Sequence, residues 1–252
     1  MIVSVTLNPS LDRTVEVDRL ERGAVLRTSS PVLEPGGKGV NLTRALSRNG
    51  VASVAVLPVA GAEGAELSAL LETAGVATRL VPVSGRTRSN LTVAEPDGTV
   101  TKLNEPGFSL STTDFSLISA MLTGQVTAGD WVVFSGSVPP GCSGDQLVQL
   151  MRTVTELGAS LAVDTSGDAL MASITARPRL IKPNRAELAE AVGRELESIS
   201  DVIAAAEELR ARGVEFVASK GAQLDARGAL TRTLMGSVMF ELVHDDRKAA
   251  GA

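Results

Sequence analysis

A glycine-rich segment at residues 35–41, Pro-Gly-Gly-Lys-Gly-Val-Asn, stands directly before a helical pattern. Three glycines in four positions let the backbone approach a ligand closely, and the free N–H groups at a helix start bind anions and polar groups. The segment is not a Walker A loop, because Gly39 rather than Ser or Thr follows Lys38. A structural turn explains such a segment equally well, so its meaning depends on what accompanies it.

Further polar segments follow apolar runs of strand length. They lie at residues 6–12, 135–141, 164–167 and 182–187, and residues 86–90 add Arg-Thr-Arg-Ser-Asn before a hairpin pattern. Polar groups at the carboxyl ends of parallel strands converge on one crevice, where open α/β sheets bind ligands. Each segment alone could be a helix cap or a turn. Their number favours a ligand site at one edge of a sheet.

Short apolar runs rich in Val and Leu alternate with helical patterns along the chain. Strands are predicted at residues 2–7, 53–59, 131–135, 160–164, 179–181 and 215–219, and helices at residues 41–48, 63–73, 113–122, 143–157, 185–192 and 198–212. Four glycines stand where helices should end: Gly50, Gly75, Gly158 and Gly213. Strand-helix alternation predicts an α/β fold with a mostly parallel sheet between helices.

One region breaks this rhythm. Residues 91–95 and 99–103 alternate apolar and polar around Pro-Asp-Gly at residues 96–98, which indicates a β-hairpin with one solvated face. Residues 14–17 and 25–28 have a similar pattern. Together they predict a small antiparallel sheet beside the main domain. The pattern leaves open whether this sheet is a decoration or a lid over a ligand.

The composition excludes several kinds of site and partner. The 252 residues contain one cysteine, Cys142, and one histidine, His244, so an intrachain disulfide is excluded and a Cys/His zinc site is not expected. A net charge of −5, no Tyr and one Trp argue against nucleic acid as the main partner. No signal-peptide pattern is present, and no run reaches the roughly 18 apolar residues of a membrane helix. We therefore expect a cytoplasmic protein without a membrane partner.

Five motifs occur in order over residues 1–222. They are an Asp at position 12, Gly-Gly-Lys-Gly-x-Asn at 36–41, Thr-Arg-x-Asn at 87–90, Ser-Gly-Ser-x-Pro-Pro-Gly at 135–141 and Lys-x-Asn-x-x-Glu at 182–187. This series resembles the PfkB, or ribokinase-like, carbohydrate kinases, and most closely their hexose-phosphate branch. The resemblance implies a β lid over the sugar and ATP-dependent, Mg²⁺-assisted phosphorylation of a hexose phosphate. Fructose 1-phosphate is the favoured substrate, with tagatose 6-phosphate and fructose 6-phosphate as alternatives.

The resemblance also implies roles for single residues on the sugar side. Five residues would contact the sugar itself: Asp12, Gly36, Gly37, Lys38 and Asn41. Three would hold the phosphate that the substrate already carries: Arg27, Arg88 and Ser137. Planar guanidinium groups suit that task because they form paired hydrogen bonds with phosphate oxygens.

A second set would bind the nucleotide. Asn184 and Glu187 match the family's Asn-x-x-Glu element, which helps to organise Mg²⁺ and the ATP phosphates. Magnesium keeps several waters, so Glu187 would act on the metal indirectly. Lys182, Ser219 and Gly221 would flank the nucleotide.

The last part of the sequence departs from the family. The second family signature, Gly-Ala-Gly-Asp, whose Asp is the catalytic base, does not occur from Gly221 onward, so the catalytic residue is unknown. The acids in that part stand in other frames: Asp225, Glu241, Asp245 and Asp246. We expect a ribokinase-like domain over residues 1–222, with lid segments near 12–30 and 86–105, and a divergent tail over 223–252.

Three explanations of this tail stay open. It is the product of a frameshifted or truncated gene, the end of a pseudokinase that binds sugar phosphate without turnover, or a rearranged but active tail. Its richness in Ala, Arg, Gly and Leu without a clear period favours the first. In the first two cases we expect binding of sugar phosphate with little turnover. The resemblance further implies a homodimer formed through the lid.

Overall fold

The computed structural model describes residues 1–28 and 30–219. The chain divides into two compact units, Met1–Leu161 and a second that begins at Ala162. Both are built from parallel strands and helices, as the alternation in the sequence predicts. Gly221 and the acids of the C-terminal segment lie outside the described residues.

Four parallel strands form the main sheet of the first unit. They are β1 (Ile2–Val5), β4 (Ser53–Val59), β5 (Thr78–Pro82) and β8 (Trp131–Ser135), in the order β8-β1-β4-β5. Ile2 of β1 is in register with both Ser53 and Trp131, so β1 is central in this part of the sheet. Most of their Val, Leu and Phe side chains are buried, which explains the nearly continuous apolar runs.

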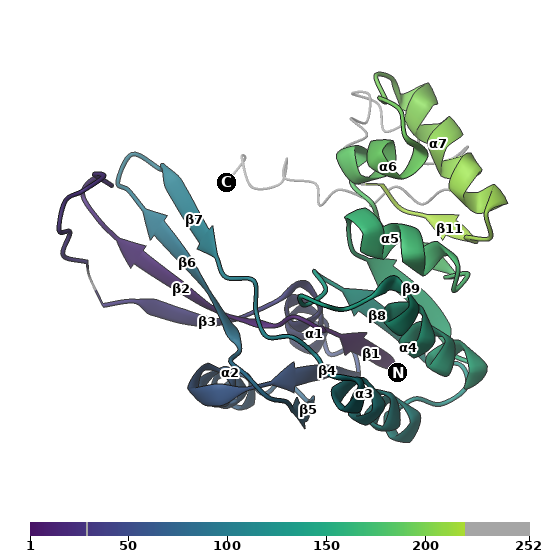
Figure 1. The fold of residues 1–252 in the computed structure, drawn as a ribbon, viewed down its shortest axis with the longest axis horizontal. Helices are drawn as coiled ribbons and strands as arrows, with labels where there is room; N and C mark the ends of the chain where they lie inside the picture. The colour runs from purple at the N-terminus through teal and green to yellow at the C-terminus, as the bar shows by residue number, and fades with distance from the viewer. Residues whose placement is uncertain (29, 220–252) are drawn as a thin grey trace. The chain divides into compact units, whose positions relative to one another are not determined.

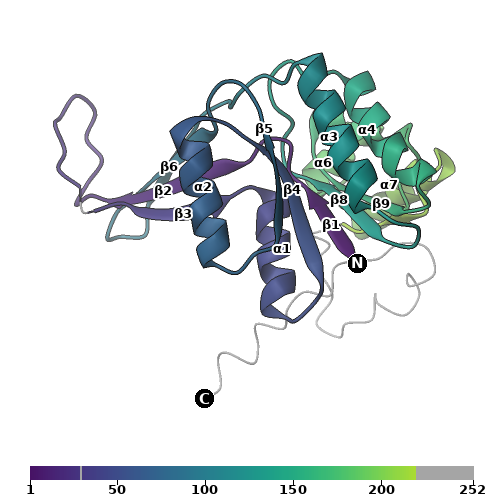
Figure 2. The same ribbon diagram turned by 90° about the horizontal axis from the view of Figure 1, so that it is seen from below.

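Helices cover both faces of these strands. α1 (Lys38–Arg48) and α2 (Gly61–Thr73) lie on one face, and α3 (Thr112–Gln125) and α4 (Gly144–Glu156) lie on the other (Figure 2). Four side chains of the core that α1 and α2 share with the sheet are fully buried: Val40 of α1, Leu57 of β4, and Leu67 and Leu71 of α2. Ser111 and Ser143 cap α3 and α4, and each closes a capping box that satisfies the first N–H groups of its helix.

Four strands form a second sheet that projects from the main one (Figure 1). They are β2 (Ser10–Glu16), β3 (Val32–Gly36), β6 (Arg88–Ala94) and β7 (Val100–Asn104), in the order β3-β2-β6-β7. The hairpin predicted around residues 96–98 is confirmed. The expected antiparallel sheet is instead mixed, because β2 and β6 pair in parallel. β2 follows β1 and β6 follows β5, so both leave the main sheet in the same direction.

The prediction of a strand at residues 25–28 is wrong. β2 pairs instead with β3, whose last residues Pro35 and Gly36 belong to the glycine-rich segment. Val25 is 89% exposed and no strand includes it. The alternating pattern at residues 25–28 therefore does not indicate a strand, because β3 takes the place beside β2.

The second unit contains most of β9 (Ser160–Asp164), together with β10 (Leu180–Ile181) and β11 (Phe216–Val217), and β10 pairs in parallel with both neighbours. Its helices are α5 (Gly167–Ile174), α6 (Arg185–Val192) and α7 (Ile199–Ala211). The predicted helices and strands recur in both units with ends shifted by up to a few residues. Three elements were not predicted: β3, β5 and α5. β3 runs into the glycine-rich segment, and β5 ends at a proline.

The four glycines predicted to end helices all have positive φ, as that role requires. Within the described part of the chain, no helix combines the length and the apolar character needed to cross a bilayer.

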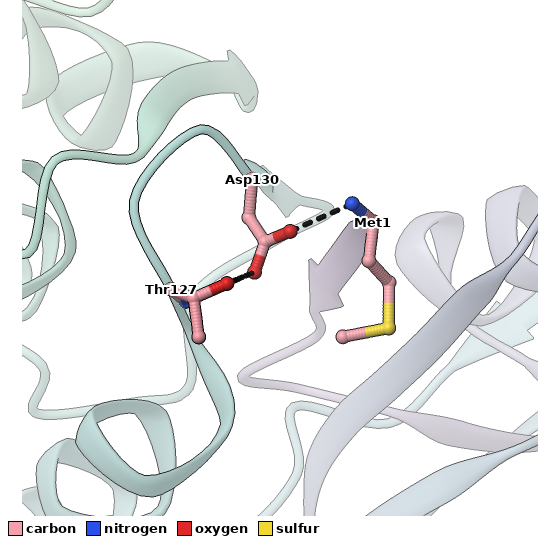
Figure 3. A network of polar contacts seen from close by, with 3 residues as sticks. All are labelled: Met1, Thr127 and Asp130. Atoms are coloured by element: carbon pink, nitrogen blue, oxygen red, sulfur yellow. Dashed lines mark hydrogen bonds and ion pairs between the residues drawn. The ribbon is translucent and has the colours of Figure 1, made fainter.

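An ion pair fastens the start of β1 beside β8. The N-terminal ammonium of Met1 lies 2.6 Å from Asp130 Oδ1, and the backbone N–H and hydroxyl of Thr127 donate to Oδ2 (Figure 3). The residue Asp130 is only 6% exposed. These donors, the ammonium first, lower the pKa of the Asp130 carboxyl below its ordinary value.

Candidate functional site

Apart from Arg27, the sugar-side residues predicted from the sequence lie around the carboxyl ends of β1 and β8 and the base of the lid sheet. β1 and β8 run in parallel, so the segments that follow Val5 and Ser135 emerge at the same edge. β2 and β6 leave from this edge and start in register, Ser10 opposite Arg88. Asp12, Arg88 and Ser137 are thereby delivered to one region of the first unit.

Asp12 is held by two side chains of the lid sheet. The hydroxyl of Ser10 donates to Asp12 Oδ1 at 2.8 Å, and Asn90 Nδ2 donates to the same oxygen at 2.8 Å. Asn90 Nδ2 also donates to Ser10 Oγ at 3.0 Å. No described residue donates a hydrogen bond to Oδ2 of Asp12, so that oxygen keeps its acceptor capacity for a ligand.

The glycines of the loop before α1 allow an approach that side chains would block. A Cβ on Gly36 would lie 2.4 Å from Asp12 Oδ1, and a Cβ on Gly39 would lie 2.4 Å from Thr6 Oγ1. Gly37 has a φ of +112° and caps α1 without a side chain. The loop is therefore pressed against Asp12 and the end of β1, and its glycines are required by space as well as by conformation.

Lys38 and Asn41 lie in the first turns of α1. A Cβ on Gly136 would lie 3.7 Å from Lys38 Cβ, so the turn after β8 packs against the start of this helix. Arg44 Nη1 donates to Asn41 Oδ1 at 3.3 Å and to the carbonyl of Pro35 at 3.3 Å. Arg44 thus donates to the amide oxygen of Asn41, and the Nδ2–H groups of Asn41 remain available to solvent or a ligand.

Arg88 and Ser137 meet at Asn8. Arg88 Nε donates to the Asn8 carbonyl at 3.2 Å and Nη1 donates to the Glu105 carbonyl at 3.4 Å, while Asn8 Nδ2 donates to Ser137 Oγ at 3.3 Å. Burial lowers the pKa of the Arg88 guanidinium and the nearby charge of Asp12 opposes that shift. An arginine remains charged in proteins, so one positive group lies near the Asp12 carboxylate and is linked through Asn8 to the Ser137 hydroxyl.

Arg27 lies in a different part of the lid. It lines a hollow of about 450 Å³ together with Glu16, Asp18 and Glu95. Glu16 is six residues along β2 from Ser10, which is roughly 20 Å in a strand. The first unit therefore does not group Arg27 with Arg88 and Ser137, and its predicted phosphate contact stays a prediction.

Four residues predicted to bind the nucleotide lie in the second unit: Lys182, Asn184, Glu187 and Ser219. Lys182 Nζ is 3.3 Å from Asp164 Oδ2, at the ends of β10 and β9. Asn184 and Glu187 form the capping box of α6: Asn184 Oδ1 accepts from the Glu187 N–H at 2.9 Å, and Glu187 Oε2 accepts from the Asn184 N–H at 2.8 Å. The Asn-x-x-Glu element thus has a structural role, and it leaves Asn184 Nδ2 and Glu187 Oε1 for other partners.

Two buried hydroxyls of the second unit lack hydrogen-bond partners among the described residues. They are Thr165 Oγ1, directly after β9, and Ser219 Oγ, shortly after β11. Unpaired buried hydroxyls are costly, so both fit a polar ligand at the carboxyl ends of these strands. Within the described residues, no group of three or more His, Cys, Asp or Glu is placed to hold a metal. Glu187 Oε1, which is not used in the capping box, is a suitable carboxylate oxygen for Mg²⁺ bound chiefly through water and phosphate oxygens.

Several residues of this arrangement were given no individual role from the sequence. Asn90, Ser10 and Arg44 fix the orientation of Asp12 and Asn41, and Asn8 joins Arg88 to Ser137. Asn90 could have been found, because it alternates with Arg88 on the same strand, opposite Asp12. Arg44 stands one helical turn after Asn41, a spacing that allows contact.

Known proteins have a similar sequence and fold. The model of the pfkB family carbohydrate kinases matches residues 5–233. The 1-phosphofructokinase of Rhodobacter capsulatus is 37% identical over 234 residues, which cover 90% of this chain and 74% of that protein. The ATP-dependent 6-phosphofructokinase isozyme 2 of Escherichia coli is 36% identical over 82% of this chain and 68% of that protein.

Solved structures agree with the sequence comparison. The crystal structure of phosphofructokinase-2 from Escherichia coli in complex with fructose-6-phosphate has a TM-score of 0.83 and 34% identity, and the match covers 86% of this chain and 73% of that one. The match extends through both units of the present chain, each of which keeps the α/β organisation expected of ribokinase-like kinases. On the family match and these relatives together, the chain belongs to the pfkB family of carbohydrate kinases, which are phosphotransferases.

Proposed function

We propose that the chain acts in the ATP-dependent phosphorylation of a hexose phosphate, with fructose 1-phosphate converted to fructose 1,6-bisphosphate as the favoured reaction. The observation that carries the proposal is the Asp12 carboxylate, which has one oxygen held by the lid sheet and the other open, beside the Arg88 guanidinium. Fructose 6-phosphate and tagatose 6-phosphate remain alternatives, since the relatives include 1-phosphofructokinases and a 6-phosphofructokinase isozyme.

The sugar would be bound by complementary donors and acceptors. Asp12 Oδ2 would accept from sugar hydroxyls, and the amide of Asn41 would donate to them, with Gly36 and Gly37 giving the sugar close access to the backbone. Because Oδ1 of Asp12 is already saturated by Ser10 and Asn90, the carboxylate need not reorient on binding. Such preorganisation reduces the free energy spent on ordering the site.

The phosphate already on the sugar would be held by Arg88 and Ser137. Two of the five N–H groups of Arg88 are used by the carbonyls of Asn8 and Glu105, and the others remain for phosphate oxygens. A charged, half-buried guanidinium suits a phosphate better than a free sugar. Arg88 therefore supports a phosphorylated substrate over an unphosphorylated one.

ATP and Mg²⁺ would be bound by the second unit, through Lys182, Asn184, Glu187 and Ser219. Gln can replace Glu in a capping box, so Glu187→Gln should keep the stability of α6 and weaken Mg²⁺-dependent ATP binding. Glu187→Ala should lower both the stability of α6 and the Mg²⁺-dependent affinity for ATP. Calorimetry with ATP, with and without Mg²⁺, and thermal melting separate the two roles; equal ATP affinity in all three chains would leave Glu187 with the cap alone.

We also propose a homodimer formed through the lid. β3 and β7 are the edge strands of the lid sheet, and exposed apolar side chains stand on them: Val32 at 61%, Val100 at 53% and Leu103 at 58%. Unpaired edges with apolar side chains favour association. One related structure is the tetrameric inhibited form of phosphofructokinase-2 from Escherichia coli, 35% identical with a TM-score of 0.80.

The proposal is tested by calorimetry and by an ADP-release assay on the 252-residue chain. Fructose 1-phosphate should bind far more tightly than free fructose, and equal affinity for the two sugars would refute the substrate class. A turnover number of about 1–100 s⁻¹, the ordinary range of kinases, would establish the whole reaction. The catalytic base would then be an Asp outside the described residues, such as Asp225, Asp245 or Asp246. Binding without turnover would favour a sugar-phosphate-binding protein.

A further inference from the structure

Asn8, which follows β1, is 3% exposed and joins segments that are distant in the sequence. Its Nδ2 lies 3.1 Å from the Pro106 carbonyl, 3.3 Å from Ser137 Oγ and 3.5 Å from the Val138 carbonyl. An amide nitrogen carries two hydrogens, so it can serve the segment after β7 and the turn after β8 at the same time. One side chain thus ties the lid sheet to the main sheet.

The hydrogen bond to Ser137 has only one direction. Asn8 Nδ2 is a donor and cannot accept, so Ser137 Oγ must accept. The proton of the Ser137 hydroxyl therefore points away from Asn8. Ser137 is exposed, so this proton is presented to whatever occupies the site, and a phosphate oxygen is a suitable acceptor for it.

Arg88 depends on the same junction. Its Nε donates to the Asn8 carbonyl, and its Nη1 donates to the carbonyl of Glu105, the neighbour of Pro106. One of these carbonyls belongs to Asn8 itself, and the Asn8 side chain holds Pro106, the neighbour of the other. Arg88 and Ser137 are therefore both oriented by hydrogen bonds with Asn8.

The amide oxygen of Asn8 contributes no hydrogen bond within the described residues. Asn8 Oδ1 is buried without a hydrogen-bond partner among the described residues, and a Cβ on Gly107 would lie 2.3 Å from it. An unpaired buried acceptor destabilises a structure. The gain from this side chain must therefore come from its two donors.

We propose that Asn8 is a positioning residue of the phosphate subsite: it sets the direction of the Ser137 hydroxyl and holds the support of Arg88 without touching the ligand. The inference rests on the proposed function, since it assumes that a hexose phosphate is the ligand. It predicts coupling between Asn8 and Ser137, which a role in stability alone would not produce.

A double-mutant cycle measured by calorimetry with fructose 1-phosphate tests the coupling. Asn8→Ala should weaken binding by about tenfold or more, in line with the loss of a buried donor. In a Ser137→Ala background, Asn8→Ala should weaken binding less, and its effect should be more than about twofold smaller than in the unchanged chain. Two independent sites would give the same effect in both backgrounds to within about twofold. Asp130→Asn, at the amino end of the same strands, is the control that lowers thermal stability without changing affinity.

The outcomes separate the inference from the proposed function. If the unchanged chain binds no hexose phosphate, both are wrong. If it binds, and Asn8→Ala has no effect or the same effect in both backgrounds, only the role of Asn8 is wrong. Should Asn8→Ala fail to fold, Asn8→Asp decides with the same cycle, because it keeps the volume but makes the Ser137 hydroxyl donate to the new carboxylate. The new carboxylate also repels the phosphate of the ligand, but this repulsion is the same in both backgrounds and cancels in the cycle.

Discussion

Replacing Gly36 by alanine should displace the Asp12 carboxylate. Gly36 ends β3 opposite Ser10 of β2, and a Cβ at this position would lie 2.4 Å from Asp12 Cγ, Asp12 Oδ1 and Ser10 Oγ. Ordinary contact begins near 3.4 Å, so these atoms must move by 1.0 Å, the difference between 3.4 and 2.4 Å. Gly36 is not among the glycines with positive φ, so the effect is one of space and not of backbone strain.

The size of the effect follows from the two hydrogen bonds on Asp12 Oδ1. Both are 2.8 Å long, and a shift of about 1 Å lengthens them beyond the usual limit of a hydrogen bond. A misplacement of about 1 Å in a binding group can reduce its effectiveness about 100-fold, which is about 2.7 kcal/mol of binding free energy. We expect Gly36→Ala to weaken fructose 1-phosphate binding by that amount, and to lower the free energy of unfolding by about 1–3 kcal/mol through overpacking.

Gly124→Ala is the matched control. Gly124 lies within α3, a Cβ added there would meet nothing within 4 Å, and its φ is not positive. The same chemical change there should stabilise the chain by about 0.5–1 kcal/mol and leave ligand affinity unchanged. The assay is isothermal calorimetry with fructose 1-phosphate, beside urea denaturation of all three chains. A Gly36→Ala chain that folds and binds with unchanged affinity would refute the placement of the sugar against Asp12.

Four further outcomes are expected. Asp130→Asn should lower the free energy of unfolding by about 1.5 kcal/mol at neutral pH, the low end for a charged hydrogen bond, because the Met1 side is one-third exposed. The pKa of Asp130 is depressed in the folded chain, so its contribution is present above the unfolded pKa of about 4 and is lost as pH falls through the folded pKa; denaturation curves of the two chains should converge in acid. Arg88→Ala should weaken hexose phosphate binding by about 1.5–3 kcal/mol, measured by calorimetry, and leave free fructose unaffected. Light scattering should give a dimer mass at micromolar concentration, and Leu103→Lys should shift it toward the monomer mass; a monomeric parent chain would count against the lid interface. Burial raises the pKa of the Cys142 thiol to about 11, so alkylation of the folded chain should still accelerate between pH 9 and about pH 11, and a plateau near pH 9 would contradict that burial.

The main α/β framework could be predicted because its signals are local. Strands such as β4 and β8 are continuous apolar runs bounded by polar residues, and the glycines after the helices mark their ends. β3, β5 and α5 were missed because none of them has a distinct period. The strand direction in the lid could not be predicted, since the parallel pairing of β2 and β6 depends on two crossings from the main sheet that are far apart in sequence.

The sequence names residues for a sugar side of the site but does not show how they are connected. Asp12, Gly36 and Arg88 stand in recognisable motifs, whereas the link between Arg88 and Ser137 passes through Asn8 and the carbonyl of Glu105. A backbone carbonyl leaves no mark in a sequence, because every residue has one. Arg27 shows the opposite limit: its residue type suits a phosphate, but its surroundings in the lid are acidic.

The Asn-x-x-Glu element shows why motif and structure have to be interpreted together. As a pattern, Asn184 and Glu187 are a nucleotide signature, and as a local structure they are a capping box that closes α6. The two roles do not exclude each other, because the box uses one oxygen of each side chain and leaves Asn184 Nδ2 and Glu187 Oε1. The cap also holds the glutamate close to the start of the helix, where the positive end of the helix dipole favours an anion. A metal bound through water needs a carboxylate held in place more than it needs direct contact. The structural role of this pair therefore supplies the rigidity that its proposed role toward Mg²⁺ requires.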